Sequence, residues 1–295
     1  MKIGVIGYGN MGSMIVNNIL KMNLLLADEE LIVSNRNIDK IKHLIEEYPD
    51  GKVQITDNNT EVASKCEKII ISVTTPNFKE LIEEILPFIN EKTHIIYTCA
   101  GIDFSKIKPY FNGKLTLVIP TIASTVTSNN TIASIARRKG VTLIKHNEKV
   151  DLQDSLFIED LFNEFSYVKT LKENSFYFEE GTEDLKSENP ELEMSTILTS
   201  CGPAFIAIMI EKFAEMASNN ANMTKEDAED MIVKTVLGTA ILKEDQNLSN
   251  WELIDKVATK GGITEEGVDL LDKRLNNLYK KLFESLLSKY EEYDN

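Results

Sequence analysis

A glycine pattern near the start of the chain limits the possible folds more than any other part of the sequence. A short β-branched segment, Lys2–Ile6, runs directly into a G-x-G-x-x-G pattern, and a stretch with helical apolar spacing follows. Strand, glycine turn and helix in this order are typical of the dinucleotide-binding element of an α/β domain, where the amino end of the helix receives a pyrophosphate. The residues expected to bind the dinucleotide here are Gly7, Tyr8, Gly9, Asn10, Met11 and Gly12.

The rest of the chain falls into two regions with different patterns. Short β-branched segments alternate with helical stretches first, which is typical of a doubly wound, mostly parallel sheet. From Met194 onward no segment has strand character, and helix-compatible stretches cover 197–219, 225–243 and 268–290. We therefore expect a Rossmann domain followed by an all-helical domain. The expected strands are Lys2–Ile6, Leu31–Ser34, Lys68–Val73, His94–Thr98, Leu115–Ile119 and Val141–Lys145, with a helix over Glu148–Phe165.

An acidic, polar stretch between Lys172 and Glu193 marks the expected boundary between these regions. It contains Gly181 and Pro190, and we interpret its carboxylates as those of a solvated linker. The predicted domains are 1–180, which binds the nucleotide, and 181–295, which is helical.

Composition excludes several classes of partner. The formal net charge of −15 over 295 residues repels nucleic acid and anionic lipid, so a small-molecule substrate is expected instead. No apolar run approaches the roughly 20 residues of a membrane span, and we expect a cytoplasmic protein without a leader. The three cysteines lack C-x-x-C spacing and the three histidines are scattered, which indicates free thiols and no structural metal.

The end of the second expected strand bears on the choice of dinucleotide. An NAD-specific enzyme places a carboxylate there to hold the ribose hydroxyls, but this chain has Ser34, Asn35 and Arg36. Arg36 can pair with a 2′-phosphate, with hydrogen bonds from the two residues before it. We therefore expect NADP(H) to be preferred, with NAD(H) possible. The alternative is that Arg36 is an ordinary solvated surface cation.

Four spaced motifs carry a resemblance to a known family over nearly the whole chain. They are Met1–Gly12, Cys99–Ile102, Ser200–Phe205 and Lys260–Thr264. With these motifs the chain resembles the pyrroline-5-carboxylate reductases. The resemblance implies NAD(P)H-dependent reduction of a cyclic imine, 1-pyrroline-5-carboxylate, to L-proline in amino-acid biosynthesis. It also implies helical domains that interlock as homodimers or higher oligomers, with active sites drawing loops from two chains.

The motifs depart from the usual family forms. Where the family has V-K-P, P-N-T-P, S-G-S-G-P-A-Y and S-P-G-G-x-T, this chain has Thr74–Pro76, Pro120–Ala123, Thr199–Phe205 and Thr259–Thr264. This set of departures resembles a divergent branch of the family, the late competence protein ComER of bacterial competence operons.

The resemblance also assigns residues to the site. The S-P-G-G-x-T loop cradles the substrate carboxylate, and the hydroxyl of Thr264 lies beside the imine nitrogen as the catalytic group. The alternative is that Thr264 only caps a helix. The substrate residues implied in this way are Thr259, Gly261, Gly262 and Thr264; the further cofactor residues are Val73, Thr74, Thr75, Ala100, Gly101, Pro120 and Thr121.

Two other functions remain open on the sequence. A β-hydroxyacid dehydrogenase-like enzyme would use a lysine in a K-x-x-x-N pattern, which Lys243–Asn247 matches at an expected helix end. A regulatory protein of the competence type would bind NADP but would have lost turnover, and the departures at V-K-P and P-N-T-P favour it modestly. Glu211 is interpreted as a helical surface or packing residue.

Overall fold

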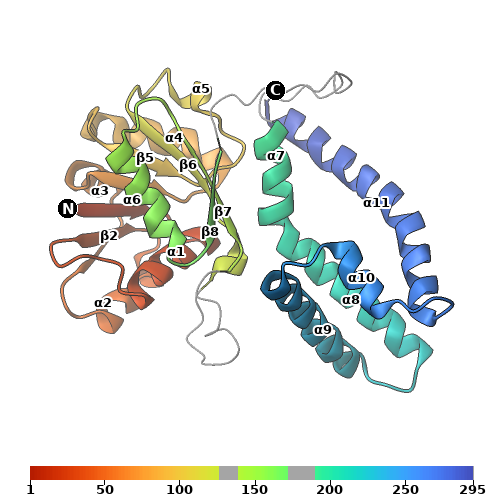
Figure 1. Cartoon of the computed structure of the whole chain (residues 1–295). Coiled ribbons are helices and arrows are strands. Elements are labelled where there is room, and N and C mark those ends of the chain that lie inside the picture. The colour runs from red at the N-terminus through yellow and green to blue at the C-terminus, as the bar shows by residue number, and fades with distance from the viewer. Residues whose placement is uncertain (126–138, 172–189, 295) are drawn as a thin grey trace. The chain divides into compact units, whose positions relative to one another are not determined.

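The computed structural model describes residues 1–125, 139–171 and 190–294 (Figure 1). The described chain divides into two compact units, Met1–Pro203 and Ala204–Tyr293, apart from the last two residues. The domain boundary expected at residue 180 falls within 172–189, outside the described residues.

The first unit is built on one eight-stranded sheet with the order β3-β2-β1-β4-β5-β6-β7-β8. Neighbouring strands are parallel from β3 to β6, β7 is antiparallel to β6, and β8 is parallel to β7. The doubly wound, mostly parallel sheet is therefore confirmed. The strands are β1 (Lys2–Ile6), β2 (Glu30–Ser34), β3 (Val53–Thr56), β4 (Lys68–Ile71), β5 (His94–Tyr97), β6 (Lys114–Ile119), β7 (Val141–His146) and β8 (Tyr167–Leu171).

Two strands, β3 and β8, were not predicted, and both lie at edges of the sheet. Edge strands bury less of their surface than central strands do, so they carry polar side chains and lack a continuous apolar run. The sequence of β8, YVKTL, buries only Leu171 fully. The central strand β4 contains the run Ile69–Ile71, which is buried on both faces of the sheet.

Helices cover both faces of the sheet and separate two apolar cores. Ile69 and Ile71 belong to one core, whereas Ile70 between them belongs to the other, as alternation along a strand requires. On the first face lie α3 (Asn59–Lys65), α4 (Thr75–Ile85) and α5 (Phe104–Ile107); on the second lie α1 (Asn10–Lys21), α2 (His43–Glu47) and α6 (Leu152–Asn163).

The helix expected over Glu148–Phe165 is shorter, because the side chain of Asp151 accepts a hydrogen bond from the Asp154 amide and caps α6 immediately before Leu152. The first unit also contains α7 (Pro190–Thr196) and a π-helical turn over Ile197–Cys201. These continue into the second unit through α8.

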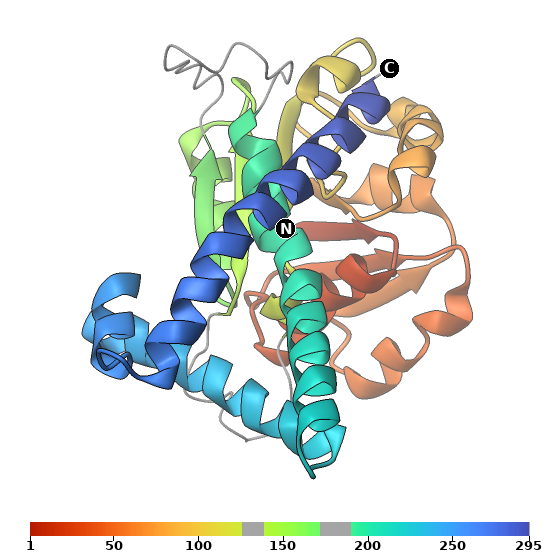
Figure 2. The same ribbon diagram turned by 90° about the vertical axis from the view of Figure 1, so that its right-hand side faces the viewer.

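The second unit is entirely helical in the part that the structure describes, which confirms the expected all-α region. It contains α8 (Gly202–Asn220, with its first residues in the first unit), α9 (Lys225–Gln246), α10 (Asn250–Val257) and α11 (Ile263–Asp294), and α11 is its longest helix (Figure 2). The short helix α10 was not predicted; a reciprocal cap between Ser249 and Glu252 begins it.

One helical stretch, Pro190–Asn220, is long and apolar enough to cross a membrane by length and composition alone. The expectation that no apolar run reaches such a length is therefore wrong here. In the sequence the polar residues Thr199 and Ser200 interrupt this apolar run, but they add no charge to it. A helix covered by other protein passes the same test, so this is weak evidence for a membrane.

Candidate functional site

A cavity of about 300 Å³ opens at the carboxyl ends of β1, β2 and β4. The sheet order places β1 between β2 and β4, so connections leave this edge in opposite directions, which is where doubly wound proteins bind ligands. The lining residues are Ile6, Gly7, Tyr8, Gly9, Ser34, Asn35, Arg36, Lys40, Asn59, Ser72, Val73, Thr74, Asn77, Glu80, Leu81 and Glu84.

The glycine loop has the geometry that a pyrophosphate requires. Gly7 adopts a φ of +98°, which favours glycine, and its amide donates to the carbonyl oxygen of Ser34 at 2.9 Å. Gly9 precedes α1, and a β carbon added to it would meet no atom within 4 Å. No acidic side chain stands in the first turn of α1, so its amides and its positive end are open to an anion.

Asn35 ties this loop to the end of β2. Its side-chain oxygen accepts from the Tyr8 amide at 3.2 Å, and its side-chain nitrogen donates to the Asn37 carbonyl at 2.7 Å. The Tyr8 hydroxyl lies 3.3 Å from both Asn17 Oδ1 and His43 Nε2. Partial burial raises the pKa of Tyr8. The glycine loop is therefore held through both the amide and the hydroxyl of Tyr8.

The polar lining includes residues that sequence reasoning missed. Lys40 ends the short 3-10 helix η1 (Ile38–Lys40) and lines the cavity together with Arg36. Its spacing of four residues from Arg36 was the one available signal. Asn59 on α3 and Glu84 on α4 also line the cavity, and they come from segments that gave no local signal. The cavity therefore holds cations and carboxylates together.

Val73 and Thr74 line the cavity as expected, while the other family-implied cofactor residues lie beyond it at the same edge of the sheet. Asn10 and Met11 form the first turn of α1, and Thr75 opens α4. Because β4, β5 and β6 are parallel, the segments after them reach this same edge. The residues placed there are Thr75, Ala100, Gly101, Pro120 and Thr121.

Two motifs separated along the chain meet at this edge. The Ser200 hydroxyl donates to the Pro120 carbonyl at 3.2 Å, which joins the turn after β6 to the π-helical segment. Cys99 Sγ lies 3.2 Å from the Val73 carbonyl oxygen. Burial raises the pKa of the Cys99 thiol to about 12, so it stays protonated at neutral pH.

The expected substrate loop lies in the second unit, before α11. Gly261 adopts a φ of +73°, and its amide donates to Glu265 Oε2 at 2.7 Å. The Gly262 amide donates to the Thr259 carbonyl at 2.9 Å. Thr264 is the second residue of α11, so Gly262, not Thr264, occupies the position before the helix. This location does not favour the cap interpretation of Thr264.

Two other sequence candidates have structural roles in the second unit. Lys243 Nζ donates to the Leu248 carbonyl at 3.1 Å, and Asn247 closes α9 with a φ of +47°. The K-x-x-x-N string is therefore part of a helix end. Glu211 is partly exposed and pairs with Lys225 at 2.5 Å, which joins α8 to α9 at the surface.

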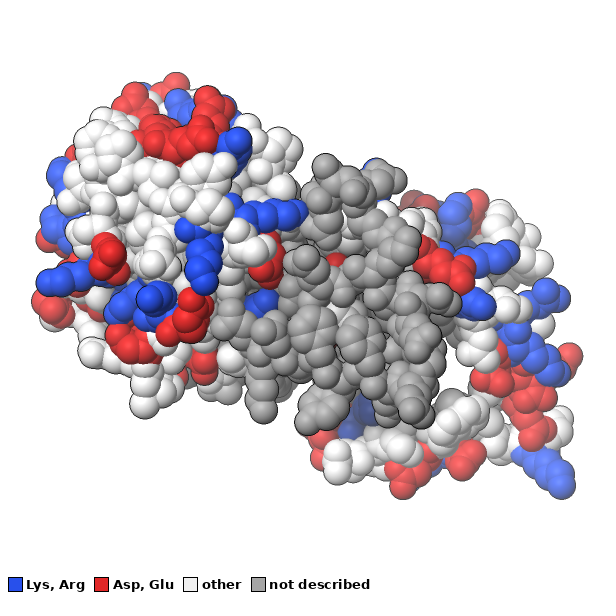
Figure 3. All heavy atoms as spheres, turned by 90° about the horizontal axis from the view of Figure 1, so that it is seen from above, with Lys and Arg blue, Asp and Glu red and all other residues white. Residues whose placement is uncertain are grey.

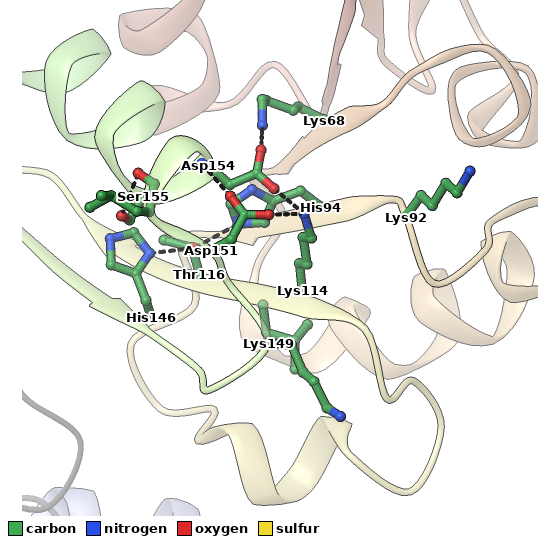
Figure 4. Close-up of polar contacts among 12 residues, drawn as sticks. Lys68, Lys92, His94, Lys114, Thr116, His146, Lys149, Asp151, Asp154 and Ser155 are labelled. Carbon is green, nitrogen blue, oxygen red and sulfur yellow. Dashed lines mark hydrogen bonds and ion pairs between the residues drawn. The ribbon is translucent and has the colours of Figure 1, made fainter.

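A second polar cluster lies at the opposite edge of the sheet, where β4, β5 and β6 begin (Figure 4). Lys68 and Lys114 both pair with Asp154, and Lys114 also pairs with Asp151 at 2.6 Å. These contacts hold the start of α6 against the sheet. Within residues 1–125, 139–171 and 190–294, no three His, Cys, Asp or Glu side chains are grouped to hold a metal.

Comparison with known proteins gives matches along the chain. Residues 189–293 match the family described as pyrroline-5-carboxylate reductase dimerisation, and residues 2–101 match NADP oxidoreductase coenzyme F420-dependent. A pyrroline-5-carboxylate reductase of Methanobrevibacter smithii is 38% identical over 93% of this chain and 98% of its own length.

Two further likenesses extend over the whole chain. ComE operon protein 4 of Bacillus subtilis (strain 168) is 25% identical over 99% of this chain and 96% of its own length. A crystal structure of Plasmodium falciparum pyrroline carboxylate reductase with NADP bound has a TM-score of 0.75 at 18% identity, covering 100% of this chain and 98% of that one. The second likeness supports the fold, and the M. smithii relative supports membership. This chain belongs to the pyrroline-5-carboxylate reductase family.

Proposed function

We propose that the chain is an oxidoreductase that reduces a cyclic imine carboxylate with NADPH, converting 1-pyrroline-5-carboxylate to L-proline. The observation that carries this proposal is the cavity in which the glycine loop stands beside Arg36 and Lys40, in a chain of this family. Two cations suit a 2′-phosphate, so we expect NADPH to bind more tightly than NADH.

Binding and orientation are the work that this chain's own residues would do. Bound NADPH supplies the hydride. The amides at Gly9 and Asn10 would hold the pyrophosphate, and the segments after β4, β5 and β6 would place the nicotinamide. A protonated imine accepts hydride without a strong protein base, so positioning and hydrogen bonding suffice.

The substrate would be held by the loop before α11. The Gly261 amide donates to the Glu265 carboxylate within the chain, so this turn presents an amide that a substrate carboxylate would take over. Thr264 would hydrogen-bond the imine nitrogen. We propose the same site residues and the same domains, 1–180 and 181–295, that the sequence predicts.

The helices of the second unit expose an apolar surface of the kind that subunits bury when they associate. Large apolar side chains are exposed on its helices, and burying them against a second copy would stabilise both copies. The match to a dimerisation family supports at least a homo-oligomer, and we propose a homodimer. Among the most exposed are Met209, Phe213, Met231, Trp251 and Leu278.

We further propose a cytoplasmic protein with neither a nucleic-acid nor a membrane partner. On the face in Figure 3, the described basic side chains are interspersed with acidic ones and form no continuous basic surface. A continuous basic surface is what a phosphate backbone requires, and the net charge of −15 opposes it further.

The decisive measurement is the loss of NADPH absorbance on adding 1-pyrroline-5-carboxylate, with proline identified as the product. Substrate-dependent oxidation supports the proposal, and NADPH binding without turnover would refute it. That second result would favour a regulatory NADP-binding protein, a candidate supported by the likeness to ComE operon protein 4 and by Thr75 at the family's lysine position. A panel of hydroxyacids with NADP+ in place of NADPH, followed by the appearance of NADPH absorbance, tests the dehydrogenase alternative.

A further inference from the structure

The nucleotide cavity is lined by side chains of both charges, from two different segments. Arg36 and Lys40 lie on the segment that follows β2, whereas Glu80 and Glu84 lie one helical turn apart on α4. Residues four apart share one face of a helix, and both carboxylates line the cavity. A nucleotide at the end of β2 would therefore meet both cations and carboxylates in this cavity.

Glu84 is connected to the end of β2 through two successive side-chain contacts. The buried Ser34 hydroxyl donates to Asn59 Oδ1 at 2.7 Å. Asn59 Nδ2 then donates to the Glu84 carboxylate, at 3.1 Å to Oε2 and 3.4 Å to Oε1. Both ends of the Asn59 amide are used, so this side chain is oriented and the Glu84 carboxylate is held at the cavity.

A carboxylate in this place acts differently on the two dinucleotides. It accepts hydrogen bonds from the ribose hydroxyls of NADH, and it repels the 2′-phosphate of NADPH. NAD-specific enzymes obtain this effect from a carboxylate at the end of the second strand, where this chain has Ser34–Arg36. Here the carboxylate comes from another element, α4.

We propose that Glu84 is a cofactor-selectivity residue, which favours the ribose diol of NADH and limits the preference for NADPH that Arg36 and Lys40 create. The inference rests on the proposed function, because it needs the cavity to hold a dinucleotide. It adds that the ratio of the affinities for NADPH and NADH depends on a residue outside the glycine loop and β2.

Glu84→Gln tests the inference because it keeps the shape and removes the charge. Dissociation constants for NADPH and NADH are measured by fluorescence titration at low and high salt. Relative to the wild-type protein, we expect NADPH to bind about three- to tenfold more tightly and NADH to bind more weakly by a similar factor. The NADPH gain should shrink at high salt.

The matched control is Glu83→Gln on the same helix. Glu83 is exposed, lies outside the cavity lining and approaches Lys79 at 4.0 Å, so its change should leave both constants as they were. A melting curve checks that each variant is folded, and Glu84→Ala replaces Glu84→Gln if that variant does not fold.

Each outcome has a defined meaning. A wild-type protein that binds neither dinucleotide overturns the proposed function and this inference together. A wild-type protein that binds NADPH, with a ratio of the two constants that Glu84→Gln leaves within twofold, overturns only the inference. An equal loss of affinity for both cofactors also overturns the inference, because that result means that Glu84 only orients Asn59.

Discussion

A β carbon placed on Gly12 would lie 2.0 Å from the carbonyl oxygen of Gly7. Gly12→Ala should therefore destabilise the first unit by about 1–3 kcal/mol, since neither backbone segment can move aside easily. Gly9→Ala is the contrasting variant, because the space around Gly9 is open. It should melt like the wild-type protein but bind NADPH at least about tenfold more weakly, since the added methyl group would occupy the position of the pyrophosphate. Melting curves and cofactor titrations on both variants check this, and equal melting temperatures would contradict it.

Arg36→Asp should weaken NADPH binding by on the order of 2 kcal/mol, or roughly thirtyfold, and narrow or reverse the preference for NADPH over NADH. The change removes a charge-assisted contact and adds a charge that repels the 2′-phosphate. Lys42→Asp is the control, since Lys42 is exposed, pairs with Asp39 at 2.5 Å and lies outside the cavity lining. Titrations of each variant with both cofactors measure the contribution of Arg36 to NADPH binding. Unchanged NADPH affinity in Arg36→Asp would mean that this arginine is only a surface cation.

Thr264→Ala should lower kcat/KM by roughly ten- to a hundredfold while NADPH affinity stays nearly the same. The reason is that a hydroxyl contact to the imine nitrogen is made best in the transition state. Thr264→Ser keeps the hydroxyl and should retain most of the activity. Steady-state kinetics and melting curves are measured on the same samples. A Thr264→Ala protein that melts earlier and yet turns over normally would assign this residue to helix stability alone.

Glu265→Gln should lower the KM for the imine carboxylate by a few-fold. In the present structure the Gly261 amide already donates to Glu265 Oε2 at 2.7 Å, so a substrate carboxylate has to displace this side chain and approach its charge. Glu266→Gln is the matched control on the next residue. The KM is measured at saturating NADPH, and an increase in Glu265→Gln would show instead that the side chain keeps the loop in its binding shape.

Stability should fall as the pH drops below about 6.5, the ordinary pKa of histidine. Burial and, to a smaller extent, the nearby charge of Lys68 together lower the pKa of His94 to about 3. Between about pH 6.5 and the lower pKa of folded His94, the unfolded chain binds a proton at this histidine and the folded chain does not. The free energy of unfolding therefore falls by about 1.4 kcal/mol per pH unit once the unfolded histidine is protonated. Burial also lowers the pKa of His146, and Thr116 Oγ1 lies 2.7 Å from a ring nitrogen of each histidine.

The check is urea unfolding at several pH values between 7.5 and 4.5. His94→Gln has no titrating ring at this position, so its stability should change less with pH than that of the wild-type protein. The same pH dependence in both proteins would show that His94 is not the group responsible.

Patterns within contiguous residues were enough to predict much of this protein. The glycine loop, the apolar central strands and the long helices each depend on neighbours in the sequence, and the structure contains all of them. The turn at Gly7 follows directly from its position after β1, since few residues other than glycine adopt a φ of +98°. The edge strands β3 and β8 escaped prediction because half-exposed strands carry no strong apolar period.

Contacts between distant segments were decided only by the tertiary structure. Ser34, Asn59 and Glu84 are separated by 25 residues at each step, and no local pattern relates them. They meet because parallel strands bring the segments after their carboxyl ends to one edge of the sheet, and β1 lies between β2 and β4 there. The sequence by itself determined that a dinucleotide loop would form. The fold decided which carboxylate lines the cavity with Arg36, since that depends on how α4 packs beside α3 and not on the order of the residues.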